Sequence, residues 1–235
     1  MDAYDLQARH APALLTILPI VLVLAAIAPR FQSAIVIPAA ISAVVLTGLQ
    51  YWLARIARTK GSGIEADLYF KWNGKPTTAM LRHADERINQ HTKLAYHAGL
   101  ERLCARFQAP TAAEERADPL GADAMYETAI DELRRRAKEQ AVPAVHRENI
   151  SYGFARNLFG LKAWGISIAG GCLLATLVII GLRTNWQFYL ATQIEIGLVV
   201  ILSLYIGAWI LGVTDRFVRV QAEGYSRALL ETIPT

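Results

Sequence analysis

The sequence predicts a mainly α-helical membrane protein: a four-helix transmembrane bundle made of two hairpins, with a mostly helical cytoplasmic domain between the hairpins. Three observations predict this fold. The 235-residue chain has four long apolar stretches that are nearly free of charge, its 54% hydrophobic residues are concentrated there, and a polar segment separates the second stretch from the third. A helix needs about 20 apolar residues to cross a bilayer core of about 30 Å, which all four stretches approach or exceed.

The boundaries of these stretches predict the domain organisation. Hairpin 1 is expected at residues 11–53, the cytoplasmic domain at 54–161, hairpin 2 at 162–213, and a cytoplasmic C-terminal tail at 214–235. The first stretch ends in a pattern typical of signal-peptide cleavage, but Pro29 and the immediate start of the next stretch favour an uncleaved hairpin. The predicted spans are Ala11–Ala28, Phe31–Leu53, Ala163–Leu182 and Phe188–Val213.

The placement of the basic residues predicts the orientation. Of the 24 Lys and Arg, 18 lie between Arg55 and Lys162, whereas each short hairpin loop holds one. Lys and Arg collect in cytoplasmic loops, so the middle segment and both termini are expected to be cytoplasmic. The same segment carries 14 Asp and Glu, and this balance argues against direct nucleic-acid binding. Arg55, Arg58, Lys60 and Lys162 are expected to meet the anionic headgroups of the lipid bilayer.

Within the cytoplasmic domain, the spacing of apolar residues predicts three helices, at Thr92–Phe107, Asp118–Lys138 and Val142–Lys162. The last of these is expected to run into the third span. Gly61-Ser62-Gly63 is typical of a flexible joint at the start of the domain.

One short β-hairpin is an alternative for part of this domain. Residues Leu68–Trp72 are rich in aromatic side chains, and Asn73-Gly74 is typical of a hairpin turn. Thr77–Leu81 would then be the returning strand. Pro76 equally suits the first turn of a helix, so both alternatives stay open.

The motifs of common enzymes and metal sites are missing from the sequence. Gly74-Lys75-Pro76 lacks the preceding glycine of a phosphate loop, and there is no Gly-x-Ser-x-Gly. The histidines match no metal-site spacing. We therefore expect a protein that is not an enzyme and has no metal or cofactor. A membrane-bound enzyme would require His83, Asp85 and His97 to lie within hydrogen-bond reach of one another.

A polar stripe at the end of the cytoplasmic domain gives the main functional candidates. Asn149, Tyr152, Arg156 and Asn157 fall on one face of a predicted helix. Such a stripe is suited to hold an anionic ligand or to couple the domain to the membrane. The alternative is that it docks the helix on the cytoplasmic domain through side-chain hydrogen bonds.

Three further residues complete the candidates. Arg82 and His83 are taken as ligand-binding or coupling residues. Glu195 is the one acidic residue in or near a predicted span, which makes it a membrane-pore candidate at a pore mouth or between subunits. The alternative for Glu195 is a place among the outer headgroups, because Ile196–Val213 is long enough to span by itself.

Several segments resemble those of uncharacterised bacterial membrane proteins with two paired-span hairpins. The architecture is also similar to that of four-span effectors of bacterial antiphage systems, in which a cytoplasmic domain senses a signal, often a nucleotide messenger, and the spans disrupt the membrane. The segments that carry the first resemblance are Trp72–Pro76, Leu81–Asp85, Thr92–His97 and Asn149–Lys162.

These observations lead to two functional hypotheses. The first is a bacterial inner-membrane sensor or effector, expected to be a homo-oligomer, whose cytoplasmic domain senses a nucleotide-type ligand or a cytosolic protein and controls a pore or membrane disruption, in keeping with antiphage defence. The second is a non-catalytic membrane anchor or scaffold that recruits a soluble partner.

Overall fold

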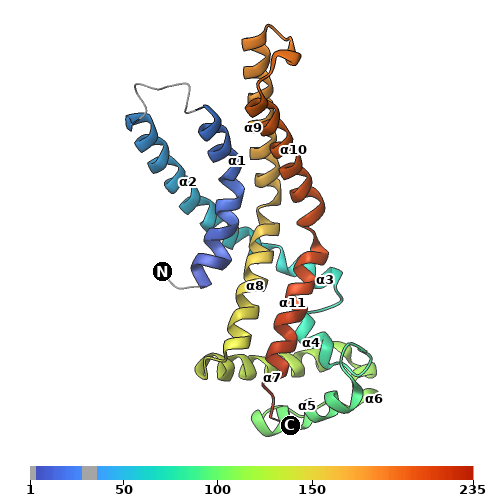
Figure 1. The fold of residues 1–235 in the computed structure, drawn as a ribbon. Coiled ribbons are helices and arrows are strands. Elements are labelled where there is room, and N and C mark those ends of the chain that lie inside the picture. Colours follow the sequence, from blue (N-terminus) through green and yellow to red (C-terminus); the bar gives the residue numbers. More distant parts are fainter. Residues whose placement is uncertain (1–3, 28–35, 235) are drawn as a thin grey trace. The chain divides into compact units, whose positions relative to one another are not determined.

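The computed structural model describes residues 4–27 and 36–234, most of which are helical. No strand occurs among them, so the prediction of a mainly α-helical chain is confirmed (Figure 1). These residues divide into two compact units, which we call unit 1 and unit 2. Unit 1 comprises the residues up to Ile64 together with Gly153–Val218, and unit 2 comprises Glu65–Tyr152 and the residues from Arg219 onward.

Unit 1 contains the long apolar helices. Within the described part of the chain, three segments are long and apolar enough to cross a membrane, as is typical of a membrane protein: Asp5–Ala26, Lys162–Thr184 and Gln193–Gly212. The elements of unit 1 are η1 (Asp5–His10), α1 (Ala11–Ile27), α2 (Val36–Gly63), the second part of α8 (Pro143–Gly160), α9 (Lys162–Thr184), η3 (Phe188–Leu190) and α10 (Gln193–Gly212).

Three of the four predicted spans overlap these apolar segments, and their starts differ by six, one and five residues. The remaining one, Phe31–Leu53, begins in residues 28–35, which lie outside the described residues. From Val36 the chain is helical as far as Gly63, so α2 continues ten residues past the predicted end of that span. The four-helix bundle stays a prediction.

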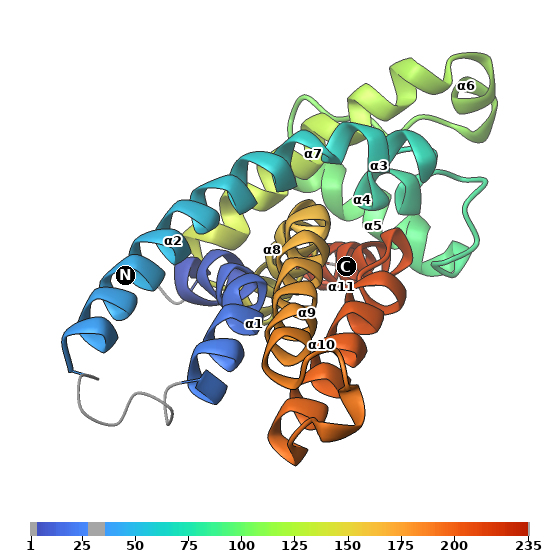
Figure 2. The same ribbon diagram turned by 90° about the horizontal axis from the view of Figure 1, so that it is seen from above.

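Unit 1 is held together by close packing between its helices. Figures 1 and 2 both show α9 beside α10, and α1 packs against α9. The core includes Leu53, Leu158, Leu161 and Trp209. Gly165 of α9 is needed here, because a Cβ at this position would lie 2.5 Å from Cε2 of Trp209.

The expectation of a flexible joint at Gly61-Ser62-Gly63 is wrong, because all three residues belong to α2. Gly61 instead permits a close approach of helices: a Cβ there would lie 2.3 Å from Oδ1 of Asn157 in α8. A Cβ on Gly160 would in turn lie 2.8 Å from the backbone nitrogen of Gly61. These glycines therefore allow α2 and α8 to pack backbone against backbone.

Unit 2 is built around α7, against which α4, α5 and α6 pack (Figure 1). Its core includes Met80, Leu100, Tyr126, Ile130 and Leu229. The elements of unit 2 are α3 (Glu65–Lys71), α4 (Pro76–Leu81), α5 (Gln90–Leu103), α6 (Ala112–Ala117), α7 (Pro119–Glu139), the first part of α8 and most of α11 (Asp215–Leu230).

The β-hairpin alternative is wrong, because its two candidate strands are the helices α3 and α4. Asn73 and Gly74 both have positive φ, 60° and 120°, and the amide of Gly74 donates to the carbonyl of Tyr69 at 2.8 Å. This bond is typical of a helix C-terminus, where the same Asn-Gly pair is favoured. Pro76 then occupies the first turn of α4.

Helices α8 and α11 connect unit 2 to unit 1 along the chain, and the sequence predicts α8 but not α11. Helix α8 ends at Gly160, and a single non-helical residue, Leu161, precedes α9. Residues 214–235, treated above as a tail, contain the amphipathic helix α11. Its Leu229 and Leu230 are fully buried in the core of unit 2.

Candidate functional site

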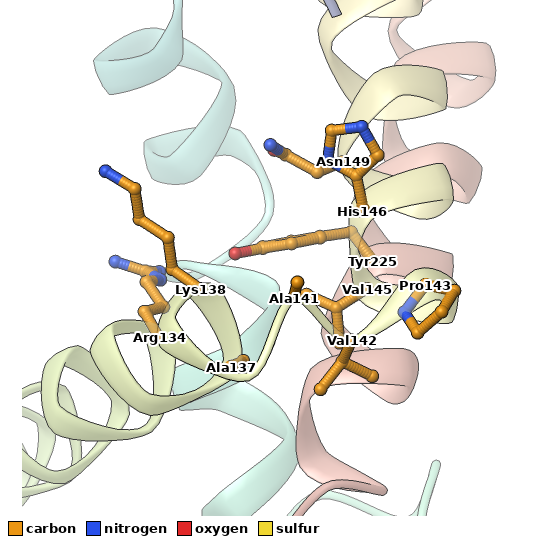
Figure 3. A pocket seen from close by; sticks show the side chains of 10 residues that line it. All are labelled: Arg134, Ala137, Lys138, Ala141, Val142, Pro143, Val145, His146, Asn149 and Tyr225. Atoms are coloured by element: carbon orange, nitrogen blue, oxygen red, sulfur yellow. The ribbon is translucent and has the colours of Figure 1, made fainter.

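The candidate site is a pocket of about 570 Å³ in unit 2, between α7, the start of α8 and α11 (Figure 3). This volume falls within the usual range for small-molecule sites. The lining residues are Arg134, Ala137, Lys138, Ala141, Val142, Pro143, Val145, His146, Asn149 and Tyr225.

A tight turn between α7 and α8 forms the pocket. Ala141 has a φ of 49°, and the amide of Val142 donates to the carbonyl of Ala137 at 3.2 Å, which closes the end of α7. Lining residues then recur at helical spacing on both sides of the turn, at 134, 137, 138 and 141 and at 142, 145, 146 and 149. The reversal of the chain therefore brings one face of α7 and one face of α8 to the same concavity.

The pocket wall combines basic with apolar side chains. Arg134, Lys138 and His146 contribute nitrogen groups, and none of the ten lining residues is Asp or Glu. In the part of the chain that the structure describes, Lys138 has no ion-pair partner. Such a wall suits an anion that also has an apolar portion.

Arg134 is the most constrained of these cations. Its Nη1 donates to Asp131 at 3.0 Å, but its buried Nε has no hydrogen-bond partner among the described residues. A buried donor without a partner is costly unless a ligand or water accepts from it. The next two residues differ: Arg135 and Arg136 donate to Glu132 at 2.6 and 2.9 Å. Of the three consecutive arginines, only Arg134 faces the pocket.

A second, smaller pocket of about 280 Å³ shares Arg134, Asn149 and Tyr225 with the first. It adds further polar groups, among them Lys75, Thr77 and the carboxylate of Glu65, which accepts from Tyr152. Lys75 pairs with Glu127 at 2.7 Å, so Arg134 and Lys138 remain the main cationic groups for a ligand. The shared residues make the two pockets neighbouring parts of one site.

Tyr152 is buried and contacts Tyr225, which lines the pocket. Its hydroxyl donates to Oε1 of Glu65 at 2.8 Å and lies 3.0 Å from the hydroxyl of Tyr69. Its ring stacks on Tyr225, with centroids 6.3 Å apart and planes inclined by 15°. Burial, reinforced by Tyr69 and Glu65, raises the pKa of Tyr152 far above its ordinary value, so the phenol stays neutral. We assign Tyr152 the role of positioning Tyr225.

The predicted polar stripe is therefore divided. Asn149 and Tyr152 belong to the site in unit 2, whereas Arg156 and Asn157 belong to unit 1. Asn157 is almost fully buried, and its Nδ2 donates to the carbonyl of Ala8 at 2.7 Å. This bond fastens η1 to α8 within unit 1, which differs from the docking on the cytoplasmic domain named above as the alternative for the stripe.

Arg82 and His83 lie outside the pocket, in a network that joins elements of unit 2. Arg82 donates to both carboxylate oxygens of Asp123, from Nε at 2.8 Å and from Nη2 at 2.5 Å. The imidazole of His83 bonds the carbonyl of Pro110 at 2.8 Å, and its amide donates to Glu115 at 3.0 Å. These contacts give both residues a structural part in unit 2.

Replacing Arg82 with Met is expected to lower the free energy of unfolding by about 2–3 kcal/mol, because Asp123 would lose its bidentate partner in a largely buried place. Arg135→Met is the matched control: its ion pairs are more than half exposed on the arginine side, and such pairs contribute less than about 1 kcal/mol. Denaturant unfolding of both variants checks this. Equal losses would contradict the role given to Arg82.

His83, His97 and Asp85 are each bonded to other groups of unit 2. The two imidazole rings lie 5.1 Å apart, edge to face, but Nε2 of His97 is bonded to the carbonyl of Leu81 at 2.9 Å. Asp85 pairs with Arg87 at 2.6 Å. Within the described residues, no three His, Cys, Asp or Glu side chains come together in a way that would hold a metal ion.

Acidification from about pH 7.5 to about pH 5.5 is expected to destabilise the fold through His97. Burial lowers the pKa of His97 below its usual 6.5, and its hydrogen bond to Leu81 opposes this only in part. Below its usual pKa, His97 binds a proton in the unfolded chain but stays neutral in the folded chain. The contribution of His97 to the free energy of unfolding is therefore complete above the unfolded pKa and is lost as the pH falls below it. His97→Gln should show a smaller drop in unfolding temperature over this interval; an equal drop would contradict the argument.

Glu195 is buried in the first turn of α10 and is paired. Its carboxylate accepts from Arg183 Nη2 at 2.7 Å and from the backbone nitrogen of Thr192 at 2.8 Å. It therefore completes the capping box of α10 and joins that helix to α9. A pore or inter-subunit role for Glu195 stays a prediction.

Comparisons with models of known protein families, with curated proteins and with solved structures give no match to this chain.

Proposed function

We propose that this chain is a membrane sensor whose unit 2 binds a small anion of nucleotide type in the pocket between α7, α8 and α11. One observation carries the proposal. The two helices that contribute His146, Asn149 and Tyr225 to the pocket, α8 and α11, are the ones that join unit 2 to the candidate membrane helices α9 and α10 along the chain.

Binding would act through these helices. An anion held by Arg134 and Lys138 of α7 adds contacts to His146 and Asn149 of α8, and these contacts exist only in the bound state. A ligand shifts a conformational equilibrium by its difference in affinity for the two states. A change in α8 or α11 reaches α9 or α10 through very short links, Leu161 in one case and residues 213–214 in the other.

The finer parts of the proposal rest on the sequence. We propose four spans from the apolar stretches, a cytoplasmic unit 2 from the charge distribution, and the bacterial inner membrane and a homo-oligomer from the resemblance to antiphage effectors. On this hypothesis, ligand binding leads to the opening of a pore or to disruption of the membrane. The net basic character of the pocket supports a nucleotide-type ligand over a neutral one.

The first test is binding by the full-length protein in detergent. ATP, a cyclic dinucleotide, inorganic pyrophosphate and uncharged adenosine are added, and the unfolding temperature is followed. We expect at least one nucleotide to raise it, adenosine to have no effect, and pyrophosphate to act more weakly because it leaves the apolar wall uncovered. No shift with any anion at millimolar concentration would contradict the proposal.

The second candidate function, a membrane scaffold, is favoured by two exposed apolar side chains of unit 2. Phe70 is 89% exposed and Leu120 is 82% exposed, so both side chains are open to contact with a partner. On this hypothesis, Phe70→Ser with Leu120→Ser would abolish recruitment of a soluble partner to the membrane, and substitutions in the pocket would leave recruitment unchanged. Co-purification of the full-length variants with that partner separates the two functions.

A further inference from the structure

A second basic pocket, of about 490 Å³, lies in unit 1 between η1 and the C-terminal half of α2. It is separate from the site in unit 2 and shares no residue with it. The lining residues are Asp5, Arg9, His10, Tyr51, Ala54, Arg55, Arg58, Thr59 and Ser62.

The charges of this pocket leave two arginines available to a ligand. Arg9 forms an ion pair with Asp5, which is the one acidic residue of the lining. Arg55 and Arg58 form no ion pair within the described ranges 4–27 and 36–234. The guanidinium of Arg55 lies over the ring of Tyr51, 5.8 Å from its centroid. A guanidinium that stacks on an aromatic ring still has its N–H groups available to donate to a planar or tetrahedral anion.

The position of the pocket along the chain indicates the source of the anion. The apolar segment Asp5–Ala26, which is long enough to cross a membrane, begins at the pocket. On α2, Tyr51 and Trp52 lie one helical turn before Arg55, and the centroids of the Trp52 and Trp164 rings are 5.8 Å apart. Trp and Tyr collect at the level of lipid headgroups, and basic residues next to them meet anionic lipids.

We propose that this pocket binds the phosphate of an anionic phospholipid, with Arg55 and Arg58 as its ligands. The pocket carries three arginines against one aspartate, so it favours a headgroup with net negative charge over a zwitterionic one. Tyr51 and Ala54 provide surface for the glycerol and the start of the acyl chains. A soluble phosphate has the same charge but gains nothing from these groups, so the lipid is the better ligand.

The test uses the full-length protein in a neutral detergent with short-chain phosphatidylglycerol, short-chain phosphatidylcholine or inorganic phosphate. Affinity is measured by the shift in unfolding temperature. We expect phosphatidylglycerol to bind and the other two to have little effect. In Arg55→Gln with Arg58→Gln, the affinity for phosphatidylglycerol should fall about thirtyfold, or about fivefold per arginine.

Lys71→Gln with Arg106→Gln is the matched control, since it removes the same charge from exposed positions outside the pocket. Its affinity should change less than about twofold. An equal loss in both double variants would overturn the proposal in favour of diffuse attraction, and equal protection by inorganic phosphate would overturn the lipid as ligand. If the pocket double variant fails to fold, Arg58→Gln alone repeats the test, with the fivefold loss expected.

Discussion

Lys138→Glu is expected to weaken binding of the nucleotide-type anion about tenfold or more, with little change in the unfolding temperature of the free protein. The substitution places a negative charge in a wall that otherwise contains no acidic residue. Because Lys138 is exposed and has no ion pair in the described part of the chain, its loss removes no contact that the fold needs. Titration calorimetry of the full-length protein in detergent measures the effect.

The control for this prediction is Lys71→Glu, at the end of α3. Lys71 is also exposed and does not line the pocket, so the variant has the same net charge as Lys138→Glu. Its affinity should stay within about twofold of the unmodified protein, since isolated surface charges act weakly at physiological salt. If both variants lost affinity equally, the anion would be responding to net charge, and the site would be elsewhere.

Gly160→Leu is expected to destabilise unit 1 by about 3 kcal/mol or to prevent its folding. A Cβ at this position would meet backbone atoms, 2.8 Å from N of Gly61 and 3.1 Å from C of Lys60. Backbone cannot turn aside as a flexible side chain can, so α2 and α8 would have to separate. The yield of folded protein in detergent and its unfolding temperature both report this loss.

Two comparisons show whether the close approach of helices is the cause. Gly171→Leu adds the same side chain in α9, where a Cβ meets no atom within 4 Å, and should cost little. On α2 itself, Gly61→Ala should destabilise, because its Cβ would lie 2.3 Å from Asn157 Oδ1, whereas Gly48→Ala has open space and should be neutral or slightly stabilising. Equal effects of Gly61→Ala and Gly48→Ala would refute the packing argument.

The helices with a strong periodic or apolar signal could be predicted from the sequence. The predicted span Ala163–Leu182 differs from α9 by only one and two residues at its ends, and the predicted helix Asp118–Lys138 matches α7 within one residue at each end. Both segments carry uninterrupted patterns that do not depend on distant parts of the chain. The apolar length of a span and the period of an amphipathic helix are local properties.

The errors arose where one local signal has two structural meanings. Asn73-Gly74 supplies positive φ, which a hairpin turn and a helix C-terminus both need, and only the rest of unit 2 decides between them. Gly61 likewise suits a flexible joint or a close helix contact. In the C-terminal segment, Ala222, Tyr225 and Leu229 have helical spacing, which is the local signal for α11.

The pocket could be predicted only in part. Asn149 and Tyr152 were among the sequence candidates, but Arg134, Lys138 and Tyr225 were not. Arg134 and Tyr225 are 91 positions apart in the sequence, and they line the same pocket because α11 packs in unit 2. The local signal at Arg134-Arg135-Arg136 indicated a helix terminus and did not show which arginine would face a cavity.

The most direct test of the proposed function is dye release from liposomes that contain the full-length protein. The nucleotide that binds in detergent is added outside, and carboxyfluorescein fluorescence is followed for the unmodified protein, Lys138→Glu and Lys71→Glu. The proposal predicts release on nucleotide addition for the unmodified protein and Lys71→Glu, and none for Lys138→Glu. Tight nucleotide binding without any release from oligomeric protein in the bilayer would contradict it and would favour the scaffold.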